Sequence, residues 1–148
     1  ATVAELLGYN LPNNAAEDSY SFLPALTGNN IESTREGIVH HSGMGFFGIR
    51  KGKWKLLLAS GSAGASKPKF DANGPNVQLY NMQEDIGEQK NVATHKPIVV
   101  AELTKLLENY IKNGRSTEGV ALKNDTDVDM WKKKKASKFS NNTKHKKK

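Results

Sequence analysis

The chain has 148 residues, no cysteine and a formal net charge of +7 at pH 7. This length suits one domain with its own core, and no apolar run is long enough to predict a membrane-spanning helix. The absence of cysteine excludes disulfides, thiolate metal sites and cysteine nucleophiles. The charge lies at one end, because residues 123–148 contain ten lysines and three aspartates and the rest of the chain is neutral. The sequence therefore predicts a neutral folded part and a basic tail.

The first residues read as a short helix that stops at Gly8, with neither an initial methionine nor a signal-peptide pattern. This opening predicts a piece of a longer protein, or a processed one. Residues 10–14 form a loop, and Pro24 interrupts the segment that follows. We expect residues 15–26 to be a short surface segment whose apolar side chains, Phe22, Leu23 and Leu26, tuck under a sheet.

A strand over residues 37–42 and a hairpin over residues 46–58 follow. Lys51 and Gly52 are the expected two-residue connection of the hairpin, since glycine tolerates a positive φ. That connection predicts a register in which Arg50 faces Lys53, Ile49 faces Trp54 and Phe47 faces Leu56. One face of the hairpin would then be apolar, made of Phe47, Ile49, Trp54 and Leu56.

Residues 97–112 give the strongest helical pattern in the chain. Thr94 or His95 is expected near the cap, Pro97 suits the first turn, and Gly114 ends the helix. Its apolar stripe is expected to pack on the apolar face of the hairpin. The stripe consists of Val99, Leu103, Leu106, Leu107, Tyr110 and Ile111.

The pattern as a whole predicts an α+β fold, an antiparallel sheet of about four strands with a C-terminal amphipathic helix packed on one face. A loose loop over 60–74, a strand over 78–82 and an acidic turn over 83–91 complete it. We expect a folded domain over residues 1–119 and a basic, disordered tail over residues 120–148.

Several motifs follow one another in order, at residues 3–8, 38–42, 45–56, 78–82 with Asp85 and 88–92, and 110–115. Together they resemble the carboxy-terminal subdomain of the formylglycine-dependent sulfatases, the arylsulfatase family, over residues 2–119. The resemblance implies hydrolysis of aryl or carbohydrate sulfate esters in the intact protein. It also implies a catalytic subdomain upstream as partner, and a secreted or periplasmic location.

In that family the nucleophile is a formylglycine made from a Cys/Ser-x-Pro-x-Arg motif, and aspartates and an asparagine hold a calcium ion. Ser66 and Pro68 begin such a motif here, but Phe70 stands where arginine is needed, and no Asp-Asp pair occurs. The resemblance therefore implies that formylglycine and calcium belong to the part of the intact enzyme before Ala1. This chain alone is expected to be inactive, with no catalytic residue and no metal ligand.

The histidine pair His40 and His41 is the sharpest polar feature of the first strand. Neighbouring residues of a strand point to opposite faces, so the two rings do not readily bind one metal ion together. The usual arrangement would be one hydrogen-bonded ring and one solvated ring. The functional alternative, which rests on the resemblance, is that one of them faces the catalytic cleft and contacts substrate.

Basic residues occur in two places. Arg50, Lys51, Lys53 and Lys55 surround the hairpin turn, where a solvated strand face is the usual interpretation and a sulfate or phosphate site is the alternative.

In the tail, Asp125, Asp127 and Asp129 begin like a calcium loop but lack its glycine and closing glutamate. The lysines of the tail are candidates for contact with a polyanion such as nucleic acid or a sulfated polysaccharide. They are Lys132, Lys133, Lys134, Lys135, Lys146, Lys147 and Lys148.

The rival function is a non-catalytic binding module whose polybasic tail binds polyanions. Upstream coding sequence separates the two, because a Cys/Ser-x-Pro-x-Arg motif in frame supports the sulfatase and a start codon before Ala1 supports the module.

Overall fold

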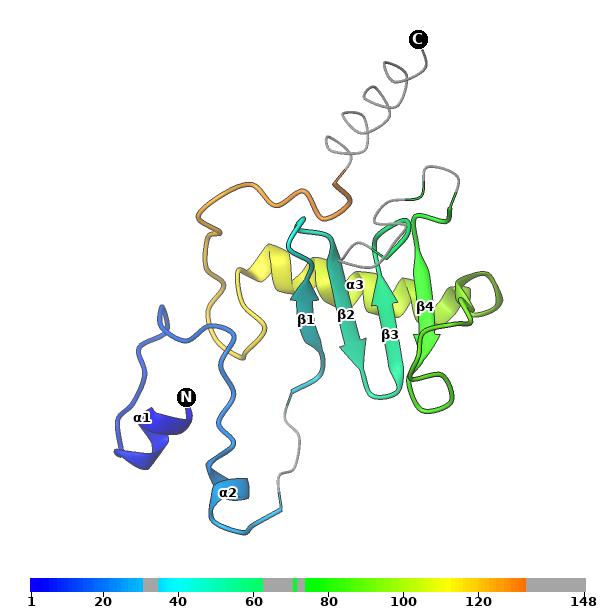
Figure 1. The fold of residues 1–148 in the computed structure, drawn as a ribbon. Coiled ribbons are helices and arrows are strands. Elements are labelled where there is room, and N and C mark those ends of the chain that lie inside the picture. The colour runs from blue at the N-terminus through cyan, green and yellow to red at the C-terminus, as the bar shows by residue number, and fades with distance from the viewer. Residues whose placement is uncertain (31–34, 63–70, 72–73, 133–148) are drawn as a thin grey trace.

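The computed structural model describes residues 1–30, 35–62, 71 and 74–132. Its centre is a four-stranded antiparallel sheet in the order β1-β2-β3-β4, with one long helix lying across one face (Figure 1). The strands are β1 (Ile38–His41), β2 (Phe47–Lys51), β3 (Trp54–Leu57) and β4 (Gln78–Asn81), and the long helix is α3 (Pro97–Asn113). The predicted α+β fold is confirmed.

The remaining elements are short. Helices α1 (Thr2–Leu6) and α2 (Leu23–Leu26) precede the sheet, and the 3-10 helix η1 (Ala93–His95) precedes α3. None of the helices in the described ranges is long and apolar enough to cross a membrane.

The hairpin register differs from the predicted one. Ile49 pairs with Leu56 and Lys51 pairs with Trp54, so the connection is Gly52-Lys53 and not Lys51-Gly52. Gly52 has φ +54°, so it begins the turn with the positive φ that glycine tolerates. The observed register places Ile49 beside Leu56, and both side chains are fully buried. Because the pairing moved by two residues, each side chain keeps its predicted face.

The core lies between the sheet and α3. The apolar face of the hairpin packs against the stripe of the helix, as predicted. Ile49, Leu56, Leu79 and Leu107 are fully buried, whereas Trp54 is half-buried at the end of the sheet. The sequence placed the right residues on this face, and the tertiary structure decides how deeply each is buried.

Helix α3 begins at Pro97, as predicted, but its N-cap is neither Thr94 nor His95. Its N-cap is Lys96, without a side-chain cap hydrogen bond, because Thr94 and His95 are taken up by η1. At the other end Gly114 has φ +62°, the left-handed cap that the sequence predicts. A Cβ at Gly114 would lie 2.4 Å from the carbonyl oxygen of Leu122. Both the positive φ and this close approach therefore require glycine at position 114.

The segment that was expected to tuck under the sheet does not do so. Phe22 and Leu26 are 54% and 64% exposed, and α2 packs against α1 instead. Hydrogen bonds from residues 13–20 to residues 115–120 hold this N-terminal arm beside the end of α3. The polar contacts of the arm, and not its apolar side chains, therefore fix its position.

The first part of the tail is packed. The amide of Leu122 donates to the carbonyl oxygen of Asn113 at 2.8 Å, and Asn124 Nδ2 donates to the carbonyl oxygen of Ile111 at 2.6 Å. Met130 is 7% exposed and belongs to the core. The first part of the segment assigned to the tail therefore packs on the domain as far as Met130. The domain boundary after residue 119 stays a prediction, and residues 133–148 lie outside the described residues.

Candidate functional site

The two histidines of β1 lie on opposite faces of the sheet, as the alternation of a strand requires. The His41 ring lies on the α3 side, where its centroid is 6.2 Å from that of Phe47. The His40 ring lies on the other side, against Gly48 and Leu57 of the neighbouring strands. The two rings therefore have separate environments.

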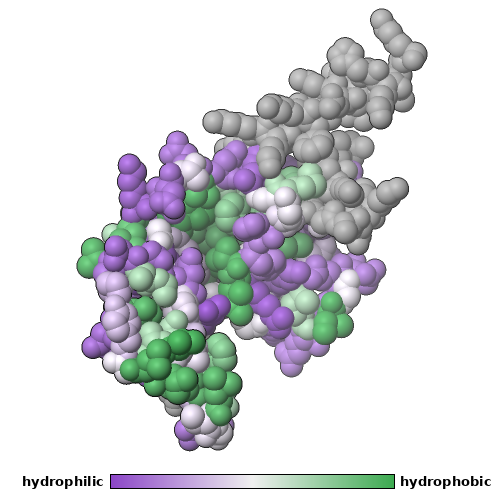
Figure 2. All heavy atoms as spheres, turned by 60° about the vertical axis from the view of Figure 1, so that its left-hand side comes forward, coloured by the Kyte–Doolittle hydropathy of each residue, from purple (hydrophilic) through white to green (hydrophobic). Residues whose placement is uncertain are grey.

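His41 is exposed and lines a cavity of about 360 Å³ between the β1 edge of the sheet and the C-terminal half of α3. Val39, Phe47 and Leu107 give the cavity an apolar floor, and Arg35 and Asp18 add a cation and an anion to its lining. Figure 2 shows this side of the molecule, with a band of hydrophobic surface between hydrophilic flanks. An apolar floor with a few polar groups is the usual make-up of a small-molecule site.

Tyr110 lines the same cavity from α3. Its hydroxyl is buried and has no partner of hydrogen-bond geometry among the described residues. Burial raises the pKa of this phenol above its usual value, and the backbone of Gly37 acts in the opposite direction. The hydroxyl thus lies near the Gly37 backbone without good hydrogen-bond geometry, and a bound molecule or water in the cavity would complete its hydrogen bonding.

Sequence reasoning did not find this cavity. Arg35 precedes the sheet, His41 ends its first strand and Tyr110 lies in α3, some 70 residues later. Tyr110 was identified only as part of the apolar stripe of the helix. No local pattern connects the three residues, because only the packing of α3 beside β1 brings them together.

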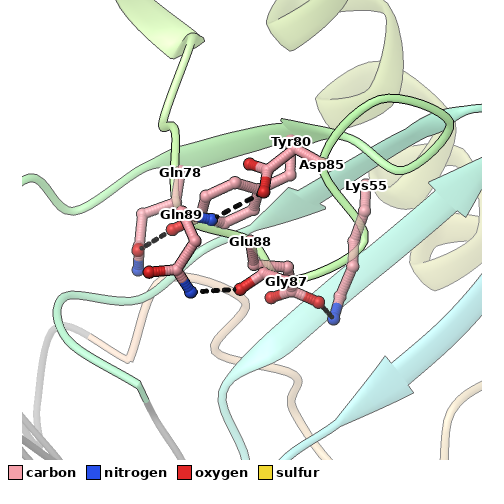
Figure 3. Close-up of polar contacts among 7 residues, drawn as sticks. All are labelled: Lys55, Gln78, Tyr80, Asp85, Gly87, Glu88 and Gln89. Atoms are coloured by element: carbon pink, nitrogen blue, oxygen red, sulfur yellow. Dashed lines mark hydrogen bonds and ion pairs between the residues drawn. The ribbon is translucent and has the colours of Figure 1, made fainter.

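The outer face of the sheet, opposite α3, carries a polar cluster (Figure 3). Lys55 and Glu88 form an ion pair that is about three-quarters buried. Beside it, Tyr80 Oη donates to Gln78 Oε1 at 2.6 Å, and Gln78 Nε2 donates to the carbonyl oxygen of Ala59 at 2.7 Å. These groups satisfy one another, so the cluster serves to hold the segment after β4 on the sheet.

The acidic turn after β4 is organised by one carboxylate. Asp85 accepts hydrogen bonds from the backbone amides of Gln89 at 2.9 Å and Lys90 at 2.8 Å. These two bonds lower the pKa of Asp85 below its usual value. The turn brings Glu88 to Lys55, with Glu88 in the left-handed region at φ +55°.

The basic residues around the hairpin turn all have partners within the chain. Lys51 pairs with Glu36 at 2.6 Å, and Arg50 Nε donates to the carbonyl oxygen of Gly52 at 3.2 Å. Lys55 is held by Glu88, and the Lys53 ammonium lies 5.4 Å from the centroid of the Trp54 ring. These contacts favour a solvated strand face over a dedicated anion site.

His40 lies close to this cluster. Burial, and then the charge of Lys55, lower the pKa of His40 below 6.5, while Glu88 opposes them. The folded state therefore prefers a neutral His40. Below pH 6.5 the unfolded chain binds the proton more readily, so the contribution of His40 to stability decreases as the pH falls through this value.

A titration of His40 measures this effect. By NMR we expect a His40 pKa below 6.5 in the wild-type chain and a higher value in Lys55→Gln, because the substitution removes the neighbouring cation. Glu88→Gln should shift the pKa in the opposite direction. An unchanged His40 pKa in both variants would contradict the assigned electrostatic environment.

The described residues were also compared with the metal site that the resemblance implies for the intact enzyme. Within the described ranges, no three His, Asp or Glu side chains come together as a possible metal site. These residues therefore do not fit a calcium ion. Ser66, Pro68 and Phe70, the incomplete nucleophile motif, lie outside the described residues.

Of the predicted polyanion-binding lysines, only Lys132 is described. Its ammonium lies 5.8 Å from the centroid of the Phe47 ring, near Gly45. Lys133, Lys134, Lys135, Lys146, Lys147 and Lys148 lie outside the described residues.

Comparison with known proteins identifies the fold. The chain is similar to an N-acetylgalactosamine-6-O-sulfatase of Bacteroides thetaiotaomicron, with 38% identity over 111 residues. This chain belongs to the sulfatase family. The match covers 74% of this chain and 22% of that sulfatase, so the chain spans less than a quarter of its relative's length. It corresponds to the carboxy-terminal subdomain of a sulfatase, as the order of its motifs indicates. No family model matches the chain.

Solved structures agree with this assignment. The sulfatase subdomain is 37% identical to a protein solved in work on the metabolism of multiple glycosaminoglycans by Bacteroides thetaiotaomicron. The TM-score is 0.60, and the match covers 73% of this chain and 23% of that one. A 2-O GAG sulfatase is 27% identical, with a TM-score of 0.52 over 74% of this chain and 23% of its own. The sheet and helix described above are therefore the sulfatase subdomain, and the relatives extend well beyond it.

Proposed function

We propose that this chain is the carboxy-terminal part of an enzyme that hydrolyses sulfate esters of glycosaminoglycan-type carbohydrates. The observation that carries the proposal is the 38% identity with an N-acetylgalactosamine-6-O-sulfatase over most of the chain. The likeness to a 2-O GAG sulfatase supports the same class of substrate. These two relatives are named for different sulfate positions, so the proposal stops at the class.

In this proposal the chemical step belongs to the rest of the enzyme. A formylglycine supplies the nucleophile in the family, and a calcium ion supports it. The residues described here do not fit the metal, and the chain has no complete Cys/Ser-x-Pro-x-Arg motif from which formylglycine is made. The role that remains for this chain is to bind and orient the substrate from one side of the cleft.

Of the two histidines, His41 is the better candidate for that role. Its ring is exposed and lies beside the aromatic ring of Phe47. Both rings line the cavity that Arg35 also lines. A sulfated sugar presents hydroxyl groups, anionic oxygens and an apolar ring face, which match these groups in kind. His40 is also exposed, but its ring lies beside Gly48 on the outer face of the sheet, away from the cavity, and burial of part of the ring lowers its pKa.

The histidine assignment predicts a split in the kinetics of the complete enzyme. His41→Ala should raise KM for a 6-sulfated N-acetylgalactosamine saccharide about tenfold and change kcat little, because a positioning hydrogen bond is lost. His40→Ala is the matched control, and its KM should stay within about twofold of wild type. Equal KM values for both variants, or a rise only in His40→Ala, would contradict the assignment.

A second expectation concerns the chain by itself. Residues 1–148 should not hydrolyse a chromogenic aryl sulfate, because the sequence has no complete motif for the nucleophile and the described residues offer no fitting set of metal ligands. The measurement is turnover after repurification, with a heated sample as blank. Heat-sensitive turnover that copurifies with the chain would overturn the proposed division of labour.

The basic tail carries a second candidate function, binding of a polyanion. The observation that favours it is the placement of the whole net charge in residues 123–148. In a sulfatase this charge would attract the sulfated polymer, and in a free-standing module it would attract any polyanion.

A further inference from the structure

The N-terminal arm exposes an unusual amount of apolar surface. Seven of the twelve large hydrophobic side chains exposed among the described residues lie within its first 26 residues, with exposed fractions of 40% to 74%. Figure 2 shows a hydrophobic lobe at the bottom of the view, at the height where α1 and α2 lie in Figure 1. We name this surface the arm patch. It consists of Val3, Leu6, Leu7, Tyr9, Leu11, Phe22 and Leu26.

The patch belongs to an ordered part of the chain. Thr2 Oγ1 accepts a hydrogen bond from the amide of Phe22 at 3.1 Å, and this contact joins α1 to α2. The amino group of Ala1 donates to Ser19 Oγ at 2.8 Å. Two separate polar contacts thus hold the ends of the arm together while its apolar side chains face outward.

The other side of the arm is fastened to the domain by a buried arginine. Arg115 is 9% exposed, and its Nη1 donates to Asn13 Oδ1 at 2.6 Å and to the carbonyl oxygen of Val120 at 3.1 Å. Thr117 Oγ1 donates to the carbonyl oxygen of Glu17 at 2.6 Å. The arm therefore has a polar side toward the domain and an apolar side toward the outside. A surface element that packs on this domain alone would have its apolar side toward the domain.

Such a surface indicates a partner. Burying a large aliphatic or aromatic side chain is worth about 1.5 to 3 kcal/mol, and monomeric proteins rarely leave large apolar patches uncovered. Single exposed side chains elsewhere, such as Ile86 and Ile98, need no such explanation. In the arm patch Val3 and Leu6 lie in α1 and Leu26 lies in α2, two helices that pack against each other, and the other four residues lie in the segments next to these helices.

We propose that the arm patch is the surface through which this subdomain packs against the catalytic portion of the same sulfatase. This inference rests on the proposed function. The sulfatase relatives extend far beyond the 22% to 23% of their length that matches here, so in those proteins a much larger part of the same polypeptide is available to cover such a surface. The partner is expected to present an apolar surface that complements seven hydrophobic side chains.

The charge of the arm argues against a lipid surface as the occupant. Residues 1–30 contain no lysine or arginine, and they carry the acidic residues Glu5, Glu17 and Asp18. Helices that lie in a membrane interface usually carry lysine and arginine on their polar face, because anionic lipids attract them. A second copy of this chain is the other rival, and the experiment distinguishes it.

The test compares one substitution in two proteins. Leu6→Glu should leave the Tm of residues 1–148 unchanged, since Leu6 is 65% exposed there. In the complete sulfatase that contains this chain it should lower the Tm by several degrees, because it places a charge in an interface. Ile86→Glu is the matched control at an 85% exposed position outside the patch, and it should be silent in both proteins.

Three results would overturn the inference. The first is a Tm of the complete protein that Leu6→Glu changes no more than Ile86→Glu does. Alternatively, residues 1–148 would form a dimer by light scattering that Leu6→Glu abolishes, which would assign the patch to a second copy. Binding of residues 1–148 to phosphatidylcholine or phosphatidylserine vesicles through the patch would assign it to lipid.

The outcome is separable from that of the proposed function, because the Tm needs no turnover. An active complete enzyme with no Leu6→Glu effect would remove only the interface. A clear Leu6→Glu effect in a complete protein that hydrolyses no sulfate ester would keep the interface and remove the activity.

Discussion

Removal of residues 133–148 should abolish binding of the chain to heparin and DNA. This segment holds eight lysines and no acidic residue, so its loss changes the net charge from +7 to −1. Six phosphate contacts would make the DNA affinity of the intact chain fall about a thousandfold between 50 and 200 mM salt. The measurement is the salt dependence of Kd by fluorescence anisotropy for both chains.

The structure decides where to cut. A cut after Leu122 would remove Met130 from the core and Asn124 from its hydrogen bond to Ile111, so binding and stability would change together. A cut after Lys132 keeps both contacts and should leave the Tm nearly unchanged.

A second variant separates the tail from the hairpin turn as the binding site. Arg50→Gln with Lys53→Gln in the full chain should reduce affinity only slightly, since the tail keeps its lysines. If the truncated chain still bound polyanions with the same salt slope, the hairpin cluster would be the site. The assignment of that cluster to a solvated strand face would then be wrong.

Leu107→Ala should destabilise the fold by about 2 to 5 kcal/mol, the usual cost of a cavity at a fully buried leucine. Leu107 is 0% exposed and lies between α3 and the sheet, in contact with the core that Ile49 and Leu56 form. Chemical denaturation with an unchanged m value is the measurement. Trp54→Ala should cost less than its size suggests, because the indole is only half-buried.

The control for this prediction lies on the same helix. Ile98 is 73% exposed, so Ile98→Ala should change the free energy of unfolding by less than about 0.5 kcal/mol. A cost for Leu107→Ala no greater than that for Ile98→Ala would contradict the packing of α3 on the sheet.

The alternation of residues in the hairpin strands predicts the faces of the side chains but not the register of the strands. Alternation with a period of two placed Phe47, Ile49, Trp54 and Leu56 on one face, and the structure confirms this. The same alternation is unchanged by a shift of two residues, so it could not select the register. The burial of Ile49 against Leu56 and the position of Gly52 select it, and the first of these depends on α3.

The cavity at the candidate site could not be predicted from the sequence. The sequence identified His40 and His41 and predicted that they point to opposite faces, but it could not say which of them has a cavity. That cavity exists because α3 lies beside β1 and brings Tyr110 near His41. Residues so far apart in the chain leave no periodic signal, since nothing local requires them to meet.

The sequence by itself determined the faces of the hairpin, the apolar stripe and glycine cap of α3, and the location of the charge. These features depend on neighbours within a few residues, where backbone geometry and side-chain spacing are fixed. Only the tertiary structure decided the register, the packing of Met130 and the outward direction of the arm patch. Each of these depends on contacts between residues far apart in the chain, such as the hydrogen bond between Arg115 and Asn13, which are 102 residues apart. Competing packings of such residues differ in buried area and in satisfied hydrogen bonds, and the local sequence pattern does not distinguish them.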